Sequence, residues 1–201
     1  MNLKEANNLM AEKKQTKRII QLTIVGGLFI FILYRSYQAD NLFAPFFYII
    51  LGVLEIILLS NVIPENFKIF KKHKNIYNLL PTFLASFIIL FTLGLYLYYE
   101  NLENSKTYIH ASGNGLIIDL KEDGKYIIKS GSWGGRTHHY GNYKINDSII
   151  FLDNNKFGKI NISGQFKQGK IYIDKEKISE NVLFQTKENK ILENTAYFYI
   201  N

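Results

Sequence analysis

The stretch LPTFLASFIILFTLGLYLYYE, residues 80–100, decides how the rest of this chain is interpreted. Its core, residues 83–99, contains no charged side chain, and residues 80–82 bring it to the roughly 20 residues that a bilayer-spanning helix requires. Because lipid offers no partner to a backbone amide, such a run is predicted to form a transmembrane helix. The chain before this stretch is largely apolar, and the chain after it is polar with a strand-like pattern.

Two further apolar runs precede it, which gives three predicted transmembrane helices. Residues 19–34 reach spanning length when they are extended to Tyr37 with the Arg35 side chain directed to the interface, and residues 42–62 form the second run. The connector 36–41 is too short to cross back, so the two runs form a hairpin. A cleaved signal peptide is the alternative for the first run, but the polar segment 1–18 is long and no small-residue cleavage site follows.

Basic residues predict the topology. The chain has 24 Lys and Arg against 17 Asp and Glu, a net charge of +7. Residues 1–18 and residues 61–79 each carry +3, whereas residues 100–201 carry only +2. By the positive-inside rule both basic segments face the cytoplasm, and the neutral connector faces outward. We therefore expect a multi-pass protein of a bacterial inner membrane, with a cytoplasmic N-terminus and a periplasmic C-terminal domain. The predicted partner of the basic segments is the lipid bilayer, and neither DNA nor RNA is predicted.

The C-terminal domain, residues 101–201, is predicted to be all-β. Turn signals recur every 8–12 residues. Asp123-Gly124 is expected to join strands 115–120 and 125–132, and Gly134-Gly135 to form a two-residue hairpin loop before a strand at 136–145. Gln168-Gly169 is expected to separate strands 159–167 and 170–174. Eight or nine strands in about 95 residues indicate a small antiparallel barrel, lipocalin-like, or a sandwich. The expected organisation is a basic N-terminal segment (1–18), a three-helix membrane module (19–100) with a basic cytoplasmic loop at 63–79, and the β domain.

Glu55 is the one ionisable residue deep in a predicted span. A carboxylate in hydrocarbon costs about 2.5–3.5 kcal/mol, so this side chain is expected to face protein or water, or to be protonated. One interpretation is a proton or ion site, or a polar contact between protomers. The other is a protonated Glu55 hydrogen-bonded to Ser86, whose depth matches when both spans are counted from their cytoplasmic ends. We favour the second, because one acid without a partner base makes a poor proton relay.

The densest polar and aromatic stretch is WGGRTHHYGNY, residues 133–143. Strand alternation directs Arg136, His138 and Tyr140 outward, and Thr137 and His139 inward with Tyr143 and Ile145. Neighbouring histidines on opposite faces cannot bind one metal without a bulge, so neither a metal nor a cofactor is predicted. One interpretation is a ligand mouth in which Trp133 stacks on the ligand and Arg136 binds an anion; the other is an amphipathic hairpin with Trp133 closing the barrel end. The candidate ligand-binding residues are Trp133, Arg136, His138, Tyr140 and Tyr143.

Motifs of known catalytic sites are absent from the sequence, as are cysteines, so we do not predict an enzyme. A short membrane-helix module followed by a β domain of about 100 residues, with the strand-and-turn run 115–153, resembles the two-transmembrane β-barrel effectors of CBASS anti-phage systems. That resemblance implies a barrel that binds a cyclic oligonucleotide, and helices that oligomerise and disrupt the inner membrane. This sequence differs from the family in its third span, which places the barrel outside the cytoplasm.

Three functional hypotheses remain. The leading one is a membrane-anchored, non-enzymatic binding protein whose β domain engages a protein or small ligand outside the cytoplasm, as an immunity protein or an accessory subunit of an envelope complex would. The alternative is the CBASS-type effector, and the third is an enzyme built around His138 or His139.

Overall fold

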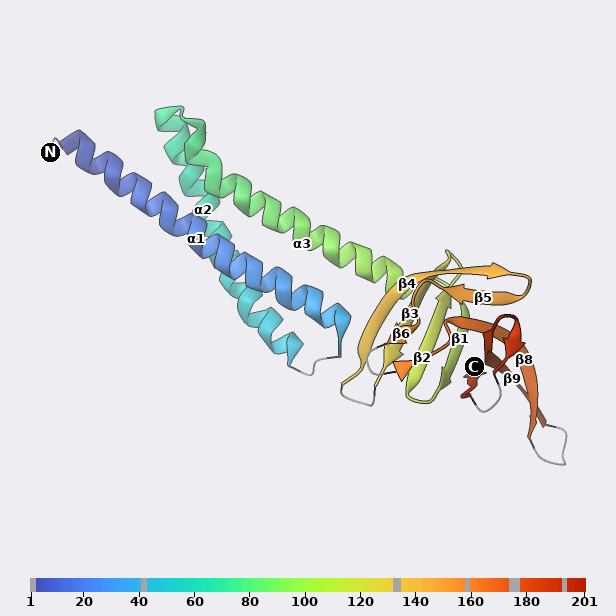
Figure 1. The fold of residues 1–201 in the computed structure, drawn as a ribbon. Helices are drawn as coiled ribbons and strands as arrows, with labels where there is room; N and C mark the ends of the chain where they lie inside the picture. The colour runs from blue at the N-terminus through green and yellow to red at the C-terminus, as the bar shows by residue number, and fades with distance from the viewer. Residues whose placement is uncertain (1–2, 41–42, 132–134, 158–159, 174–177, 193–194) are drawn as a thin grey trace. The chain divides into compact units, whose positions relative to one another are not determined.

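Three long helices form the first half of the chain in the computed structural model (Figure 1). The structure describes all residues except 1–2, 41–42, 132–134, 158–159, 174–177 and 193–194. The helices are α1 (Leu3–Gln38), α2 (Ala44–His73) and α3 (Leu80–Asn104), with a short 3₁₀ helix η1 (Ile76–Leu79) before α3. All three are long and apolar enough to cross a membrane, which makes this chain a membrane protein.

Helix α2 extends further than predicted and absorbs most of the basic segment that we expected to be a loop. Pro45 lies in its first turn, where proline is tolerated, and Pro64 lies inside it. Lys74 ends the helix in a left-handed conformation with φ 52°, and its N–H donates to the Phe70 carbonyl at 2.7 Å. The predicted span ended where the apolar run ends, whereas the helix itself continues into the basic segment; Pro64 inside it removes one N–H, which bends or weakens a helix without necessarily ending it.

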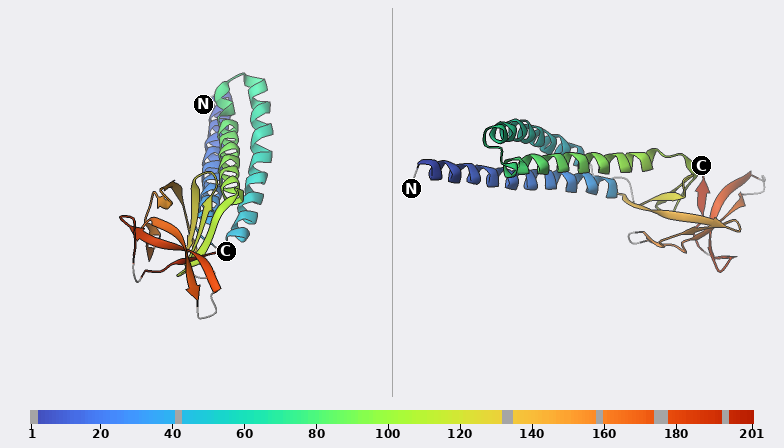
Figure 2. Two further views of the ribbon diagram at one scale, coloured as in Figure 1. Left: turned by 90° about the vertical axis from the view of Figure 1, so that its right-hand side faces the viewer. Right: turned by 90° about the horizontal axis from the view of Figure 1, so that it is seen from above.

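Close contacts hold the helices together. Leu22, Val62, Ala85 and Ile88 form their buried core. Gly26 lets α1 approach α3, since a Cβ atom at this position would lie 2.7 Å from Cδ1 of Ile88; Figure 2 shows these two helices side by side.

The two basic segments also meet. The Arg18 guanidinium donates to Asn66 Oδ1 at 3.0 Å and pairs with Glu65, which also pairs with Lys14. Gln15 donates to the Asn78 side chain at 2.8 Å. Residues 14–18 of α1 therefore lie at the same end of the helices as the last part of α2 and η1.

The second half of the chain is a closed antiparallel barrel of eight strands, as predicted (Figure 2). The strand order is β9-β11-β1-β2-β3-β4-β5-β8, and pairing of β8 with β9 closes the ring. A short β10 extends β9, and β6 with β7 form a separate two-stranded sheet. The bounds are β1 (Thr107–Gly113), β2 (Leu116–Lys121), β3 (Lys125–Ser130), β4 (Thr137–Asn146), β5 (Ile149–Leu152), β6 (Lys156–Phe157), β7 (Ile160–Asn161), β8 (Gln165–Ile173), β9 (Ile178–Lys187), β10 (Lys190–Ile191) and β11 (Phe198–Ile200).

Only some of the predicted turns are correct. The Asp123-Gly124 turn joins β2 and β3, with Gly124 at φ +83°. The two-residue loop at Gly134-Gly135 is wrong, because Ser130 pairs with Thr137 and six residues connect them. Gly169 lies inside the continuous strand β8, where a Cβ atom would lie 2.8 Å from Cε2 of Phe184. This glycine makes room for an aromatic ring on the neighbouring strand rather than a turn.

Large aromatic side chains fill the interior of the barrel. Tyr126, Phe157, Phe166 and Phe198 are each no more than 1% exposed. The Phe166 and Phe198 rings meet edge to face at 5.7 Å, and those of Tyr126 and Phe157 at 6.0 Å. The described interior is thus a packed core, which places the polar surfaces of interest on the outside of the barrel.

The chain divides into a helical unit, Met1–Ser36 with Leu42–Tyr99, and a barrel unit, Tyr37–Asn41 with Glu100–Asn201. The sequence assigned residues 37–41 to the membrane module, but they pack with the barrel.

Candidate functional site

Alternation along β4 sorts the predicted site residues onto two faces. His138 and Tyr140 lie on the outer face, as expected. His139 faces inward, where its ring contacts Phe157 at 5.4 Å. Tyr143 also faces the core, and its hydroxyl donates to the Lys121 carbonyl at 2.7 Å. Ile145 was expected in the core but is half exposed, because it lies near the end of the strand.

The remaining predicted residues lie before β4. Arg136 contributes its backbone carbonyl, which accepts from the Asp40 N–H at 2.8 Å. Trp133 lies outside the described residues. His138 and Tyr140 therefore lie together on the outer face of β4, whereas Tyr143 lies on the inner face. The ligand-binding role of the five predicted residues stays a prediction.

The connector between α1 and α2 occupies the outer face at His138 and Tyr140. Asp40 Oδ1 lies 2.9 Å from His138 Nε2, and the Tyr140 hydroxyl donates to the Tyr37 carbonyl at 2.7 Å. Ala39 forms an antiparallel bridge with Thr137. This pairing is possible because β5 covers only the second half of β4, residues 143–146, and leaves the edge of the first half for the connector.

The end of α3 completes this arrangement. Glu103 accepts from the Tyr140 hydroxyl at 3.1 Å and from Lys129 Nζ at 3.3 Å. The Tyr37 hydroxyl donates to Glu100 at 3.4 Å, so the ends of α1 and α3 meet here. We call this set the junction cluster; its residues are Tyr37, Asp40, Glu100, Glu103, Lys121, Lys129, His138 and Tyr140. Each of its side chains has a polar partner within the chain itself, although His138 Nδ1 is buried without a hydrogen bond among the described residues. This is the arrangement of a structural joint rather than of an open ligand site.

Lys121 is the most buried cation of the junction cluster, at 4% exposed. Its ammonium donates to the carbonyls of Glu103 and Ser105 at 2.9 and 3.0 Å, and to the Thr107 hydroxyl at 3.3 Å. The last carbonyls of a helix have no partner within the helix, and a cation placed there interacts favourably with the helix dipole. Lys121 therefore caps α3 from strand β2.

We expect Lys121→Met to lower the free energy of unfolding by about 2 kcal/mol, since hydrogen bonds to a charged group contribute about 1.5–3 kcal/mol and the methionine replaces the packing of the stem. Thermal unfolding of the full chain in detergent, followed by near-ultraviolet circular dichroism, should show a Tm lower by roughly 4–8 °C. Lys144→Met, at an exposed position on β4, is the matched control and should change little. Equal effects of the two substitutions would contradict the capping role.

A second set of polar groups links the buried Tyr126 to the exposed residues Asn142 and Asp153. The Tyr126 hydroxyl donates to Asp153 Oδ1 at 2.7 Å, and the Asn142 N–H donates to Asp153 Oδ2 at 2.8 Å. Burial and then the nearby Asp153 carboxylate raise the pKa of Tyr126. Burial opposes ionisation of Asp153, but the hydrogen bonds from Tyr126 and Asn142 outweigh it and lower the pKa of this carboxyl. Both pKa shifts favour a protonated Tyr126 and an ionised Asp153, which are the states in which Tyr126 donates to Asp153. This hydrogen bond therefore stabilises the fold.

His139 has a similar structural role. Its Nε2 lies 3.1 Å from the Ser130 hydroxyl. Burial, and then the neighbouring His138, lower the pKa of His139 and favour the neutral ring. Among the described residues, no three His, Cys, Asp or Glu side chains come together in a way that could hold a metal ion.

Glu55 lies between the helices but is not bonded to Ser86. Both of its carboxylate oxygens are buried without a hydrogen-bond partner among the described residues. Ser86 lies on an exposed face of α3, and the α3 hydroxyls that line the same groove as Glu55 are those of Thr92 and Tyr96. The prediction paired the two residues by depth alone, and depth does not fix which way a side chain points around its helix.

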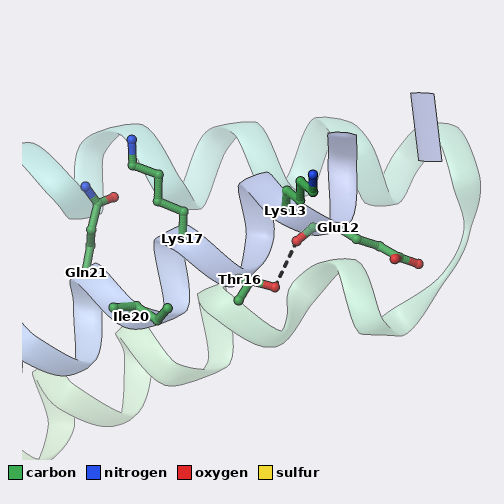
Figure 3. Close-up of a pocket in the computed structure, with 6 residues that line it drawn as sticks. All are labelled: Glu12, Lys13, Thr16, Lys17, Ile20 and Gln21. Atoms are coloured by element: carbon green, nitrogen blue, oxygen red, sulfur yellow. Dashed lines mark hydrogen bonds between the residues drawn. The ribbon is translucent and has the colours of Figure 1, made fainter. Parts of the chain in front are cut away.

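A groove of about 700 Å³ runs along the N-terminal part of α1 (Figure 3). All of its lining residues belong to this one helix, so it is an open face rather than an enclosed pocket. Lys13 and Lys17 extend from this face. The lining residues are Glu12, Lys13, Thr16, Lys17, Ile20 and Gln21.

Comparisons with protein-family models, with curated proteins and with solved structures found no match to this chain. The functional argument therefore depends on the geometry alone.

Proposed function

We propose that this chain is a membrane-anchored, non-enzymatic binding protein whose barrel lies on the periplasmic side of a bacterial inner membrane and engages a protein or small ligand there. The observation that carries the proposal is the junction cluster, in which the α1–α2 connector packs on β4 of the barrel. The connector and the barrel must then lie on the same side of the membrane. The two basic segments meet around Arg18, about 28 Å along α1 from Tyr37, which is close to the thickness of the hydrocarbon core. The positive-inside rule assigns that end to the cytoplasm.

The outer face of β9 and β11 supplies a surface for a partner. Tyr197 and Tyr199 project from it with their rings 5.4 Å apart, and Phe184 lies 6.3 Å from Tyr197. The intervening residues Phe198 and Leu183 point into the core, so these three rings face outward. Aromatic side chains of this kind are enriched in the central contacts of protein interfaces. This aromatic face is consistent with the role of an immunity protein or of an accessory subunit in an envelope complex.

Sidedness tests the proposal. Alkaline phosphatase, whose disulfides form only outside the cytoplasm, and green fluorescent protein are each fused at Asn201 in the full chain. We expect an active phosphatase and no fluorescence. Matched fusions after Asn75, which follow only two helices, should give the opposite result. Fluorescence at Asn201 together with an inactive phosphatase would contradict the periplasmic assignment.

The second candidate function is the CBASS-type effector, and the observation that favours it is Glu55. Intramembrane carboxyl groups can hold helices of different protomers together, as an oligomer that disrupts the membrane would require. This function predicts that cells expressing the chain take up a membrane-impermeant dye only when a cyclic oligonucleotide is produced. Our leading proposal predicts no uptake in either condition.

A further inference from the structure

The second groove of interest lies among the three helices and is separate from the barrel. Its volume is about 340 Å³, and it is lined by side chains from α1, α2 and α3. Most of them are apolar; the polar exceptions are Glu55, Thr92 and the phenol of Tyr96. The lining residues are Phe29, Leu33, Glu55, Leu59, Ile89, Thr92, Leu93 and Tyr96.

Two polar groups in this groove have no hydrogen-bond partner among the described residues. Glu55 is only 7% exposed, and neither of its carboxylate oxygens accepts or donates a hydrogen bond within the described chain. The buried Thr92 hydroxyl is also unpartnered there. Leaving such groups unpaired in hydrocarbon costs several kcal/mol each, so a ligand that supplies the missing hydrogen bonds would be favoured.

The depth of Glu55 limits what can reach it. It lies eleven residues into α2, or about 17 Å below the start of the helix, near the middle of the bilayer. The headgroup of a phospholipid stays at the surface and cannot reach this level. The occupant must therefore enter from the hydrocarbon phase and must itself be largely apolar.

The length of the groove and the number of its oxygen atoms argue against two other occupants, a metal cation and a partner helix. A metal cation such as Ca²⁺ takes six to eight oxygen ligands, whereas this groove offers the two oxygens of Glu55 and two hydroxyls. A partner helix would need a long groove, but the lining covers two turns of α3 and about one turn each of α1 and α2. A small molecule fits better, because ligand pockets begin at about 300 Å³ and are mostly apolar with a few polar groups that fix orientation.

We propose that this groove binds a small amphiphile with an amine head, whose N–H donates to the Glu55 carboxyl while Thr92 provides a second polar contact. If Glu55 keeps its proton, its O–H donates to the amine nitrogen instead. Both Glu55 oxygens and the Thr92 hydroxyl are covered in this structure, so the two side chains must rotate toward the groove when the ligand binds. The apolar tail of the ligand then lies against Phe29, Leu33 and Leu59. This site goes beyond the binding role of the barrel, and neither proposal depends on the other.

The test uses the reactivity of Glu55 toward N,N′-dicyclohexylcarbodiimide in the full chain, reconstituted at one copy per phosphatidylcholine nanodisc. A protonated carboxyl adds across one C=N bond of this apolar reagent: its oxygen bonds to the central carbon and its proton passes to nitrogen. The acyl group then moves to nitrogen, so the chain gains the mass of one whole reagent molecule and nothing leaves. Mass spectrometry of peptides should place the adduct on Glu55. Glu55→Gln should lack it.

Matched competitors identify the head group. N,N-dimethyloctylamine carries one N–H when protonated and cannot form an amide with the activated carboxyl. It should slow the labelling about tenfold when about nine-tenths of the grooves are occupied. Octyltrimethylammonium, which has the charge but no N–H, and n-decane, which has no head, should slow it less than about twofold. In Thr92→Val the labelling should persist and the protection by the amine should weaken.

Three results would overturn the proposal. Labelling of Glu55 in chain unfolded by dodecyl sulfate but not in nanodiscs would mean that the groove is closed to small molecules. Equal protection by n-decane would mean that it binds hydrocarbon without regard to the carboxyl. Labelling that disappears when several copies share a disc would identify a second copy of the chain as the occupant. None of these results bears on the side of the membrane on which the barrel lies.

Discussion

Replacing Gly141 by alanine should lower the free energy of unfolding of the barrel by about 3 kcal/mol. Gly141 faces inward on β4, where a Cβ atom would collide with the Tyr126 hydroxyl and the Asp153 carboxylate. Overpacking of this kind costs about 1–3 kcal/mol. Displacing the Tyr126 ring also breaks its hydrogen bond to Asp153, which adds about 1.5–3 kcal/mol because the acceptor is charged.

Thermal unfolding of the full chain should show this loss as a Tm lower by roughly 6–12 °C. Gly135→Ala is the matched control, since no atom of the described residues lies within 4 Å of its Cβ position, and its effect should stay within about 0.5 kcal/mol. In a Tyr126→Leu background, Gly141→Ala should cost much less, because the colliding ring is gone. An undiminished cost in that background would show that the clash with Tyr126 is not the cause.

The parts of the fold that were predictable from the sequence depend on local patterns. Long apolar runs identified the three helices, and Asp123-Gly124 identified one tight turn. Strand alternation predicted that His138 and Tyr140 lie on the outer face of β4 and His139 and Tyr143 on the inner face, because the two-residue period of a strand requires no knowledge of its neighbours.

The errors arose where the answer depends on residues far away in the chain. Gly169 has the same sequence signature whether it forms a turn or accommodates Phe184, and only the β8–β9 register decides between them. The partners of His138 and Tyr140 were not predicted either, because these side chains contact Asp40 and Tyr37, which lie 98 and 103 residues earlier. No local pattern in β4 indicates such partners.

The membrane site illustrates the same limit. The charge of Glu55 within an apolar run was sufficient to identify it as unusual. Its position in one groove with Thr92, and its lack of a hydrogen-bond partner among the described residues, follow from the rotation of α2 and α3 about their axes, which the helical period alone does not fix between two helices.

The second large effect is expected at Phe166, where alanine should lower the free energy of unfolding by about 3–5 kcal/mol. The Phe166 ring is fully buried and meets the Phe198 ring, so its removal leaves a cavity that the closed barrel cannot easily collapse. Tyr172→Ala is the matched control on the same strand β8. Because Tyr172 is 74% exposed, its truncation should cost no more than about 0.5 kcal/mol.

The Phe166→Ala protein also tests where a ligand can bind. An apolar cavity in a packed core stays dry and accepts benzene, so benzene should raise the Tm of Phe166→Ala and leave that of the wild-type protein nearly unchanged. If the wild-type protein were itself stabilised by benzene, or if the truncation cost less than about 1 kcal/mol, the barrel would already contain space for a guest. A ligand inside the barrel would then explain the protein better than a partner on its aromatic outer face, and the comparison of these two proteins decides between the two locations.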